Sequence, residues 1–350
     1  MNFFWWLSFA VVMSAATTGF LRRYVLTHRV VDVPNERSSH DVPIPRGGGV
    51  AIVVTFLTCV AVLVVSGGVA VSLGAGLLGA GAVAGTIGFL DDLSHIAARW
   101  RLGAHFLAAI WALVWLGGLP PIDLVGFSVN LGWLGHVLAA VGLVWMLNLY
   151  NFMDGIDGIA GLEAVTAGLG ASALLLLESP VPEDWFIPAL LAMAALGFLV
   201  WNWPPAGIFM GDAGSGFVGL AFGILAVQAS WSVPALLWSW AVLLGVFIVD
   251  ATVTLLRRVW RGEKPYEAHR RHAYQRAASR HGHKVVTVVV GVINLFWLLP
   301  ISLLIGLGKL DGLAGVVVAY VPLVWLVIEY KAGVPLASSL RPDLRNVAHS

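Results

Sequence analysis

Residues 70–90 read AVSLGAGLLGAGAVAGTIGFL, and this apolar run stops directly at Asp91 and Asp92. A membrane-spanning helix needs about 20 predominantly apolar residues, and the stretch has that length without one charged side chain. The whole chain shares this character, since 59% of its 350 residues are hydrophobic, 11% are charged and the mean hydropathy is +0.87. Because a soluble globular domain carries about 25% charged residues, the sequence predicts an all-α polytopic membrane protein.

Outward from this run, the hydropathy pattern predicts about 11 transmembrane helices. Their approximate bounds are 2–21, 48–66, 70–90, 103–119, 131–149, 158–177, 186–202, 214–230, 234–256, 286–306 and 312–330. No basic segment precedes the first run, which favours a spanning helix over a cleaved signal peptide. No soluble stretch interrupts the series, so we expect one integral-membrane domain over residues 1–350. The lone Cys59 excludes an internal disulfide, and we expect it to be a small buried apolar side chain.

The placement of basic residues predicts the orientation. With the N-terminus outside, the inside segments are 22–47, 91–102, 150–157, 203–213, 257–285 and 331–350. Nineteen of the 20 Lys and Arg residues then lie inside, and only Lys309 lies outside. Since Lys and Arg accumulate in cytoplasmic loops, we expect an odd number of spans, the N-terminus outside and the C-terminus in the cytoplasm.

Polar motifs of interest all fall in the segments assigned to the inside. Residues 33–49, VPNERSSHDVPIPRGGG, place Arg46 where it can contact phosphate, beside glycines that let the backbone approach a ligand closely. A turn that merely follows the basic-inside rule is the alternative. Asp91 and Asp92 repel each other at a membrane boundary, a cost that a cation or a shared proton relieves. A solvated pair at a helix end is the plainer interpretation.

Residues 148–158, NLYNFMDGIDG, carry a polar side chain at every third position. These side chains are Asn148, Asn151, Asp154 and Asp157. On a helix, residues three apart share a face, and amide and carboxylate oxygens suit Mg²⁺. A polar cap at a helix end is the alternative interpretation.

Two further segments carry candidate residues. In FMGDAGSG (209–216), Asp212 is either the N-cap of an apolar helix or a metal ligand beside backbone amides, and Ser215 is an alternative cap. In HRRHAYQ (269–275), His269 and His272 have the spacing of one helix face, and Arg270 and Arg271 complete a phosphate clamp. A basic loop on anionic lipid is the alternative for that segment.

Taken together, these motifs resemble the polyprenyl-phosphate N-acetylhexosamine-1-phosphate transferase family, glycosyltransferase family 4. The histidine loop looks most like the subgroup that initiates O-antigen synthesis. The matching strings are PNERSSHDVPIPRGGG (34–49), GFLDD (88–92), NLYNFMDGIDGIAG (148–161), MGDAGS (210–215) and HRRHAYQ (269–275). They occur in the family's order and extend across nearly all predicted spans.

The resemblance implies a set of roles. Positions implied for catalysis and the lipid phosphate or pyrophosphate are Asp91, Asp92, His269 and His272. Positions expected to bind substrate are Arg46, Asn148, Asp154, Asp157, Arg270 and Arg271. Positions implied for Mg²⁺, with Mn²⁺ as the alternative, are Asn151 and Asp212. A third acidic residue seen in some relatives is missing at 93–95, and His105 stands where a residue such as Gln is expected.

The implied reaction transfers a sugar-1-phosphate from a UDP-N-acetyl sugar to polyprenyl phosphate in a bacterial inner membrane, at a cytoplasmic active site. No nucleic-acid partner is expected, and a homodimer is left open. UDP-GlcNAc, UDP-FucNAc and UDP-QuiNAc are equally compatible donors. The rivals are a transporter that uses the intramembrane Glu163 and Asp250, a CDP-alcohol phosphotransferase and a non-enzymatic lipid scaffold. Polar groups gathered on one face argue against the transporter, and Asp157-Gly158-Ile-Ala-Gly lacks the arginine of the CDP-alcohol signature.

Overall fold

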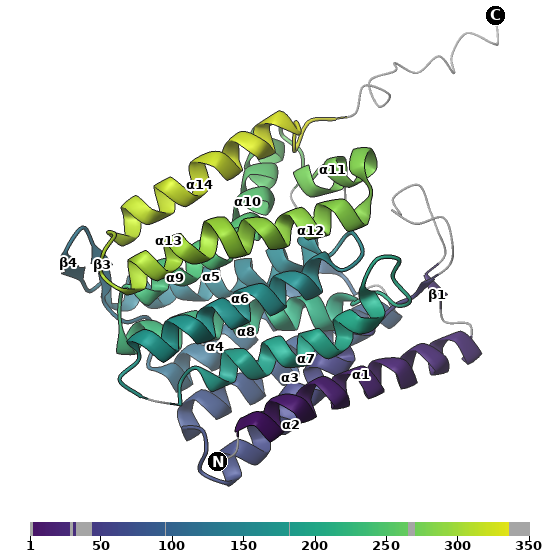
Figure 1. The fold of residues 1–350 in the computed structure, drawn as a ribbon, viewed down its shortest axis with the longest axis horizontal. Coiled ribbons are helices and arrows are strands. Elements are labelled where there is room, and N and C mark those ends of the chain that lie inside the picture. The colour runs from purple at the N-terminus through teal and green to yellow at the C-terminus, as the bar shows by residue number, and fades with distance from the viewer. Residues whose placement is uncertain are drawn as a thin grey trace, which may run out of the picture.

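The fold is a bundle of long helices that run roughly alongside one another (Figure 1). The computed structural model describes residues 3–28, 31–32, 44–94, 96–181, 183–264 and 270–335. Its α-helices are α1 (Phe3–His28), α2 (Val50–Val65), α3 (Val71–Leu93), α4 (Ala98–Leu116), α5 (Gly132–Met153), α6 (Ile159–Glu178), α7 (Phe186–Asn202), α8 (Asp212–Ser232), α9 (Leu236–Leu243), α10 (Gly245–Trp260), α11 (Ala273–His281), α12 (His283–Ile293), α13 (Leu299–Gly306) and α14 (Gly312–Glu329).

Short irregular elements complete the chain. A π-helix, η1 (Asn294–Leu298), joins α12 to α13. Strand β1 (Val31–Asp32) pairs antiparallel with β2 (Ile44–Pro45), and β3 (Ile122–Leu124) pairs antiparallel with β4 (Phe127–Val129) in a hairpin. These strands lie in the connections and leave the body of the protein helical.

The prediction of an all-α polytopic membrane protein is confirmed. Among the described residues, 7 helices are long and apolar enough to cross a membrane, or up to 8 if the bent pair α9–α10 is one span. Helices α2 and α7 are apolar but shorter, and α4 carries Arg99 and Arg101 in its first turn. Each predicted apolar run is helical in the structure, while a total of 11 spans stays a prediction.

The run 234–256, predicted as one span, is bent by 74° between α9 and α10. The helix breaks at Leu244, whose ψ is 14°, and α10 begins at Gly245. Glycine is a poor helix former, and a Cβ at Gly245 would lie 3.1 Å from the Tyr320 ring of α14. Hydropathy alone does not detect this bend, because the apolar run continues without interruption across the break at Leu244.

Helix α8 forms the centre of the bundle. In its apolar segment, 94% of the residues are buried inside the protein, compared with 17% for the apolar segment of α1 and 22% for that of α14. Figure 1 accordingly places α1 and α14 at opposite edges of the bundle. Exposed rings on α1, among them Phe4 and Trp5, suit a lipid-facing surface.

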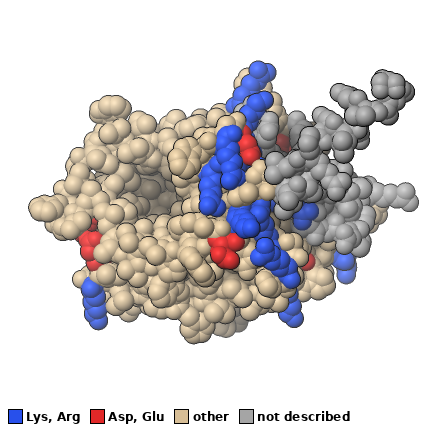
Figure 2. Space-filling model, turned by 90° about the horizontal axis from the view of Figure 1, so that it is seen from above, with Lys and Arg blue, Asp and Glu red and all other residues tan. Residues whose placement is uncertain are grey.

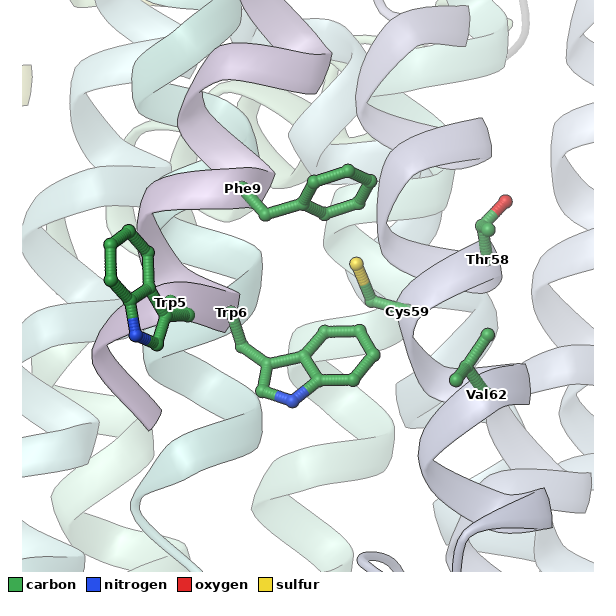
Figure 3. A pocket seen from close by; sticks show the side chains of 6 residues that line it. All are labelled: Trp5, Trp6, Phe9, Thr58, Cys59 and Val62. Carbon is green, nitrogen blue, oxygen red and sulfur yellow. The ribbon is translucent and has the colours of Figure 1, made fainter. Parts of the chain in front are cut away.

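A pocket of about 330 Å³ lies between α1 and α2, near the N-terminal end of α1. Figure 3 shows the rings of Trp6 and Phe9 on one side of it and Cys59 on the other. Cys59 is fully buried, which confirms the expectation of a small buried side chain. The pocket is almost entirely apolar, and among the described residues that line it the Cys59 thiol is the only ionisable group.

The two ends of the bundle differ in polarity. Figure 1 shows the N-terminus of α1 at the same end as the β3–β4 hairpin, with β1, α11 and the C-terminal end of α14 at the other end. Lys and Arg side chains on the face drawn in Figure 2 gather toward this second end. The loops that carry the polar motifs therefore share one end of the molecule with most of its visible basic side chains.

Candidate active site

The start of α8 is capped by a carboxylate from another helix. Asp92, near the end of α3, accepts hydrogen bonds from the backbone N–H groups of Asp212 at 3.0 Å and Ala213 at 3.1 Å. Of the sequence interpretations, capping by Asp212 or Ser215 is wrong, since no side chain of α8 caps it and the Ser215 hydroxyl donates to the Gly211 carbonyl. A carboxylate at a helix N-terminus is stabilised by unpaired N–H groups and the helix dipole. Asp92 therefore holds Asp212 against the end of α3.

Glycines allow the backbones around this contact to approach closely. A Cβ at Gly88 would lie 2.6 Å from the backbone of Ala213, and one at Gly49 would lie 2.5 Å from the Cα of Gly214. The N–H groups of Gly48 and Gly49 donate to the carbonyls of residues 209 and 210 at 2.9 and 2.8 Å. The sequence suggested that this glycine run approaches a ligand, whereas in the structure it packs against the segment before α8.

Two arginines bridge the carboxylates. Nε of Arg46 lies 3.0 Å from Asp92 Oδ1, and the same guanidinium pairs with Asp212. Arg101, from α4, pairs with Asp91 and lies 3.7 Å from Asp212 Oδ2. The side chains of Arg46 and Arg101 are 44% and 36% exposed, compared with 6% for Asp92 and 7% for Asp91. The cationic groups thus face the solvent, where an anionic substrate would meet them.

The end of α5 places two side-chain amides, those of Asn148 and Asn151, beside this cluster of carboxylates and arginines. Asn151 donates through Nδ2 to the Ser215 hydroxyl of α8 at 3.1 Å, which leaves its amide oxygen as the atom able to bind a cation. Asn148 donates to the carbonyl of Val144 at 2.7 Å, and its Nδ2 lies 3.4 Å from Nδ1 of His105. The structure thus brings Asn151 to the start of α8 and directs Asn148 toward α4.

The predicted helical stripe is interrupted after Asn151. Helix α5 ends at Met153, and Gly158, with a φ of 75°, precedes α6, so Asp154 and Asp157 lie in the turn between the helices. Asp157 accepts from the backbone N–H of Ala206 at 3.1 Å, and Nδ1 of His283 lies 3.2 Å from its Oδ1. The expectation that all four polar residues share one helix face is therefore wrong.

Asp154 lies close enough to the carboxylates of Asp92 and Asp212 for their charges to affect its pKa. Burial raises the pKa of Asp154 well above its ordinary range, and the Asp212 and Asp92 carboxylates raise it further, while the Arg46 guanidinium and the Gly211 amide oppose the rise. Carboxylates close enough to perturb one another favour a bound cation or a shared proton.

The histidine loop is held by acidic residues. His269 lies outside the described residues. His272 is 3% exposed, and its Nδ1 lies 3.3 Å from Asp250 Oδ1. Asp250 also accepts from the N–H groups of Ala273 and Tyr274 at 3.0 and 2.9 Å, so it caps α11. The intramembrane Asp250, a candidate transport residue by sequence, thus anchors this loop.

The basic residues of the loop also have acidic neighbours. Arg271 lies 2.6 Å from Glu263, which pairs with Arg258 at 3.0 Å on its other oxygen. Burial would raise the pKa of Glu263, but the two arginines hold it below its ordinary value. Arg270 lies close to Tyr274. Burial raises the pKa of the Tyr274 hydroxyl, and the positive charge of Arg270 opposes that rise.

The donor set suits a hard divalent cation by its chemistry. Three carboxylates (Asp91, Asp92 and Asp212) pair with two guanidinium groups in the described part of the site, and Asp154 lies within electrostatic reach of them. Within that part, no group of three or more His, Cys, Asp or Glu side chains is arranged to hold a metal ion. The carboxylates face the arginines, and their excess negative charge together with the Asn151 amide oxygen matches what Mg²⁺ prefers.

Sequence reasoning missed two residues of the site. Arg101 was considered only as a basic residue of an inside segment. Its place in the first turn of the helix that follows Asp91 could have predicted the ion pair between the two residues. His283 stands at the start of α12 and reaches Asp157 across 126 positions of sequence. No local pattern links residues that far apart.

Fold and site together define a polytopic membrane protein that gathers carboxylates, amides and arginines at one end of its helices, an arrangement suited to phosphate chemistry. The model of glycosyl transferase family 4 matches residues 74–230, which include Asp91, Arg101, Asn151 and Asp212. This match covers a little under half of the chain, so that region is similar to the family, and the chain is a membrane transferase.

Relatives extend the likeness beyond that region. The probable undecaprenyl-phosphate N-acetylglucosaminyl 1-phosphate transferase of Bacillus subtilis (strain 168) is 28% identical over 80% of this chain and 78% of its own length. The decaprenyl-phosphate N-acetylglucosaminephosphotransferase of Mycolicibacterium smegmatis is 28% identical over 80% and 77%. A phospho-N-acetylmuramoyl-pentapeptide-transferase of Moorella thermoacetica is 34% identical over 49% of this chain and 57% of its own length.

Proposed function

We propose that this chain transfers an N-acetylhexosamine 1-phosphate from a UDP-sugar to undecaprenyl phosphate, releases UMP and thereby initiates O-antigen or a related cell-envelope polysaccharide. The observation that carries the proposal is the cluster in which Arg46 and Arg101 bridge Asp91, Asp92 and Asp212. The Bacillus subtilis and Mycolicibacterium smegmatis relatives, each matched over 80% of the chain, are named as transferases of N-acetylglucosamine phosphate, which makes UDP-GlcNAc the first donor to test.

The proposed topology has 11 spans, an outside N-terminus and a cytoplasmic site in a bacterial inner membrane. It is supported by the helical state of every predicted run and by the basic residues of the inside segments. In Figure 1 the N-terminus of α1 and the C-terminal end of α14 lie at opposite ends of the bundle, which is consistent with an odd number of crossings. A soluble nucleotide would then reach the site from the cytoplasm while the lipid enters from the bilayer.

In the proposed reaction, an oxygen of the lipid phosphate attacks the sugar-linked phosphorus of the UDP-sugar. A phosphorus–oxygen bond forms to the lipid, the bond to the bridging oxygen breaks, and UMP leaves with that oxygen. A phosphate monoester has a second pKa near about 6, so the nucleophile is already deprotonated and needs no general base. The chain's task is to offset the repulsion between two anions and to align them.

The residues divide this task. The exposed guanidinium groups of Arg46 and Arg101 attract the phosphates, while Asp91 and Asp92 fix the arginines and the start of α8. Asp92 has both oxygens engaged by donors of the protein, which supports a positioning role for it. Asn148, Asp154 and Asp157 surround the same end and are proposed to bind the nucleotide side of the donor.

Mg²⁺, with Mn²⁺ as the alternative, is proposed as the cofactor. Asn151 and Asp212 would hold it through their oxygens, and it would supply charge neutralisation at the donor pyrophosphate. On the histidine loop, His269, Arg270, Arg271 and His272 are proposed to contact the pyrophosphate. Burial of His272 against Asp250 supports a share in shaping the loop as well.

The test is UMP release by the purified protein in detergent. Undecaprenyl phosphate and Mg²⁺ are supplied with UDP-GlcNAc, UDP-FucNAc or UDP-QuiNAc, and matched samples contain EDTA or the Asp212→Ala variant. We expect lipid-dependent UMP from one donor, loss of release with EDTA, and recovery on adding Mg²⁺. UMP release that EDTA leaves unchanged would remove the metal from the proposal, and folded protein that releases none with a wider donor panel would overturn the function.

A further inference from the structure

The chain turns back on itself after α14 and crosses the flank of the histidine loop. Lys331 and Gly333 have φ values of 53° and 74° in this turn. The N–H of Gly333 then donates to the carbonyl of Arg271 at 2.8 Å. Residues 332–334, here named the C-terminal strap, thus bond directly to the backbone of the loop that carries the predicted phosphate contacts.

Arginines hold three consecutive carbonyls of the strap. Arg257, at the end of α10, donates to the carbonyl of Ala332 at 3.1 Å, and Arg261 donates to that of Gly333 at 2.7 Å. Arg276, on α11, donates to the carbonyl of Val334. The donors stand at the end of α10 and on α11, so the strap ties these two helices together.

Charge makes this arrangement more than a packing contact. Burial lowers the pKa of Arg276, and neighbouring Arg271, Arg280 and Arg261 lower it further. Backbone carbonyls accept hydrogen bonds, and bonds donated by a charged guanidinium are stronger than those between neutral groups. The strap therefore supplies acceptors to a group of cations that would otherwise repel one another.

The strap meets the loop at a position that matters for the donor. It donates to the carbonyl of Arg271, the residue between Arg270 and His272. The Arg271 side chain forms an ion pair with Glu263, which also pairs with the buried Arg258. Movement of the strap would therefore shift the backbone that carries three of the four residues assigned to the pyrophosphate.

We propose that the C-terminal strap positions the histidine loop for the donor pyrophosphate, so that residues 332–334 set the affinity for the UDP-sugar without touching it. This inference rests on the proposed function. It predicts a change in the KM for the donor, with little change in the KM for the lipid, because the hydrogen bonds of the strap to the described site elements go to the histidine loop, to α11 and to the end of α10.

Gly333→Val is the direct test, and Gly308→Val is its matched control. Both glycines have positive φ, which a β-branched residue tolerates poorly. A Cβ at Gly333 would lie 3.0 Å from the carbonyl oxygen of Thr254, whereas nothing lies within 4 Å of one at Gly308. We expect Gly333→Val to raise the donor KM by about tenfold or more, and Gly308→Val to leave it unchanged.

Truncation gives a second measurement, which tests the inference even if the Gly333→Val variant folds poorly. A chain ending at Lys331 lacks the strap, and one ending at Pro335 keeps it while losing residues 336–350. We expect only the shorter chain to lose donor affinity, measured as the KM in UMP release and as binding of UDP-GlcNAc to folded protein. Equal donor KM in the two truncated chains and in Gly333→Val would overturn the inference, and absence of UMP release from the unaltered chain would instead count against the proposed function.

Discussion

Asp92→Asn is the substitution that probes the centre of the site. Asp92 Oδ1 accepts from the Asp212 N–H and faces Nε of Arg46, and Oδ2 accepts from the Ala213 N–H. An amide has one acceptor oxygen, so its nitrogen must face one of these donors and its negative charge is gone. One charge-assisted hydrogen bond contributes about 1.5–3 kcal/mol, and a charge at a helix N-terminus about 0.3–2 kcal/mol. We expect the free energy of unfolding to fall by about 2–4 kcal/mol.

Activity should fall along with stability. Loss of the charge and of one acceptor loosens the first turn of α8, and Asp212 and Arg46 move relative to each other. A displacement of about 1 Å at reacting groups costs about 100-fold in rate, so we expect kcat for UMP release to fall by about that factor. The assay is UMP release at saturating donor and lipid, with unfolding in detergent followed on the same preparation.

Asp311→Asn is the matched control for this substitution. Asp311 caps α14 by accepting from the Ala314 N–H at 3.0 Å, at the opposite end of the bundle. Asn and Asp cap helices about equally well, so stability and kcat should hardly change. If Asp92→Asn were as stable and as active as Asp311→Asn, the role of Asp92 in holding α8 and the site would be refuted.

Further predictions concern the stability of buried contacts. Gly88→Ala places a Cβ 2.6 Å from the Ala213 backbone and should lower the free energy of unfolding by about 1–3 kcal/mol. Its control is Gly103→Ala, whose Cβ would have nothing within 4 Å and which should be neutral or stabilising. Both variants are compared by their melting temperatures in detergent, and equal melting temperatures would contradict the close approach of α3 and α8. Asn294→Leu removes the amide that donates to buried Glu163 at 2.6 Å and should cost about 1–3 kcal/mol, measured by unfolding in detergent. An unchanged unfolding midpoint would show that this buried pair contributes nothing to stability.

Much of the fold could be predicted because the bilayer imposes a simple rule. A segment without charge and about 20 residues long has to be a helix there, and each predicted run is helical. The gathering of the polar motifs at one end of the bundle could be predicted too, since all of them fall in segments assigned to one side, while the assignment of that side to the cytoplasm stays a prediction. The bend at Leu244 could not, because it depends on the packing of α14 against Gly245.

The site could be predicted in its members more than in its contacts. Asp91, Asp92 and Asp212 stand out as charges at the ends of apolar runs, but nothing in the sequence says that α3 lies beside α8. The cap that Asp92 supplies to α8 and the cap that Asp250 supplies to α11 both come from other helices. Capping rules read local sequence, so acceptors delivered by tertiary packing escape them.

The most direct test of the central claim follows the phosphorus atoms. UDP-GlcNAc, or whichever sugar supports UMP release, is labelled on the sugar-linked phosphate and incubated with the protein, undecaprenyl phosphate and Mg²⁺. Transfer of a sugar-1-phosphate predicts that the label enters the lipid product and that the released nucleotide is unlabelled UMP. Label recovered in UDP, with an unlabelled glycolipid, would mean that the sugar alone is transferred and would contradict the account.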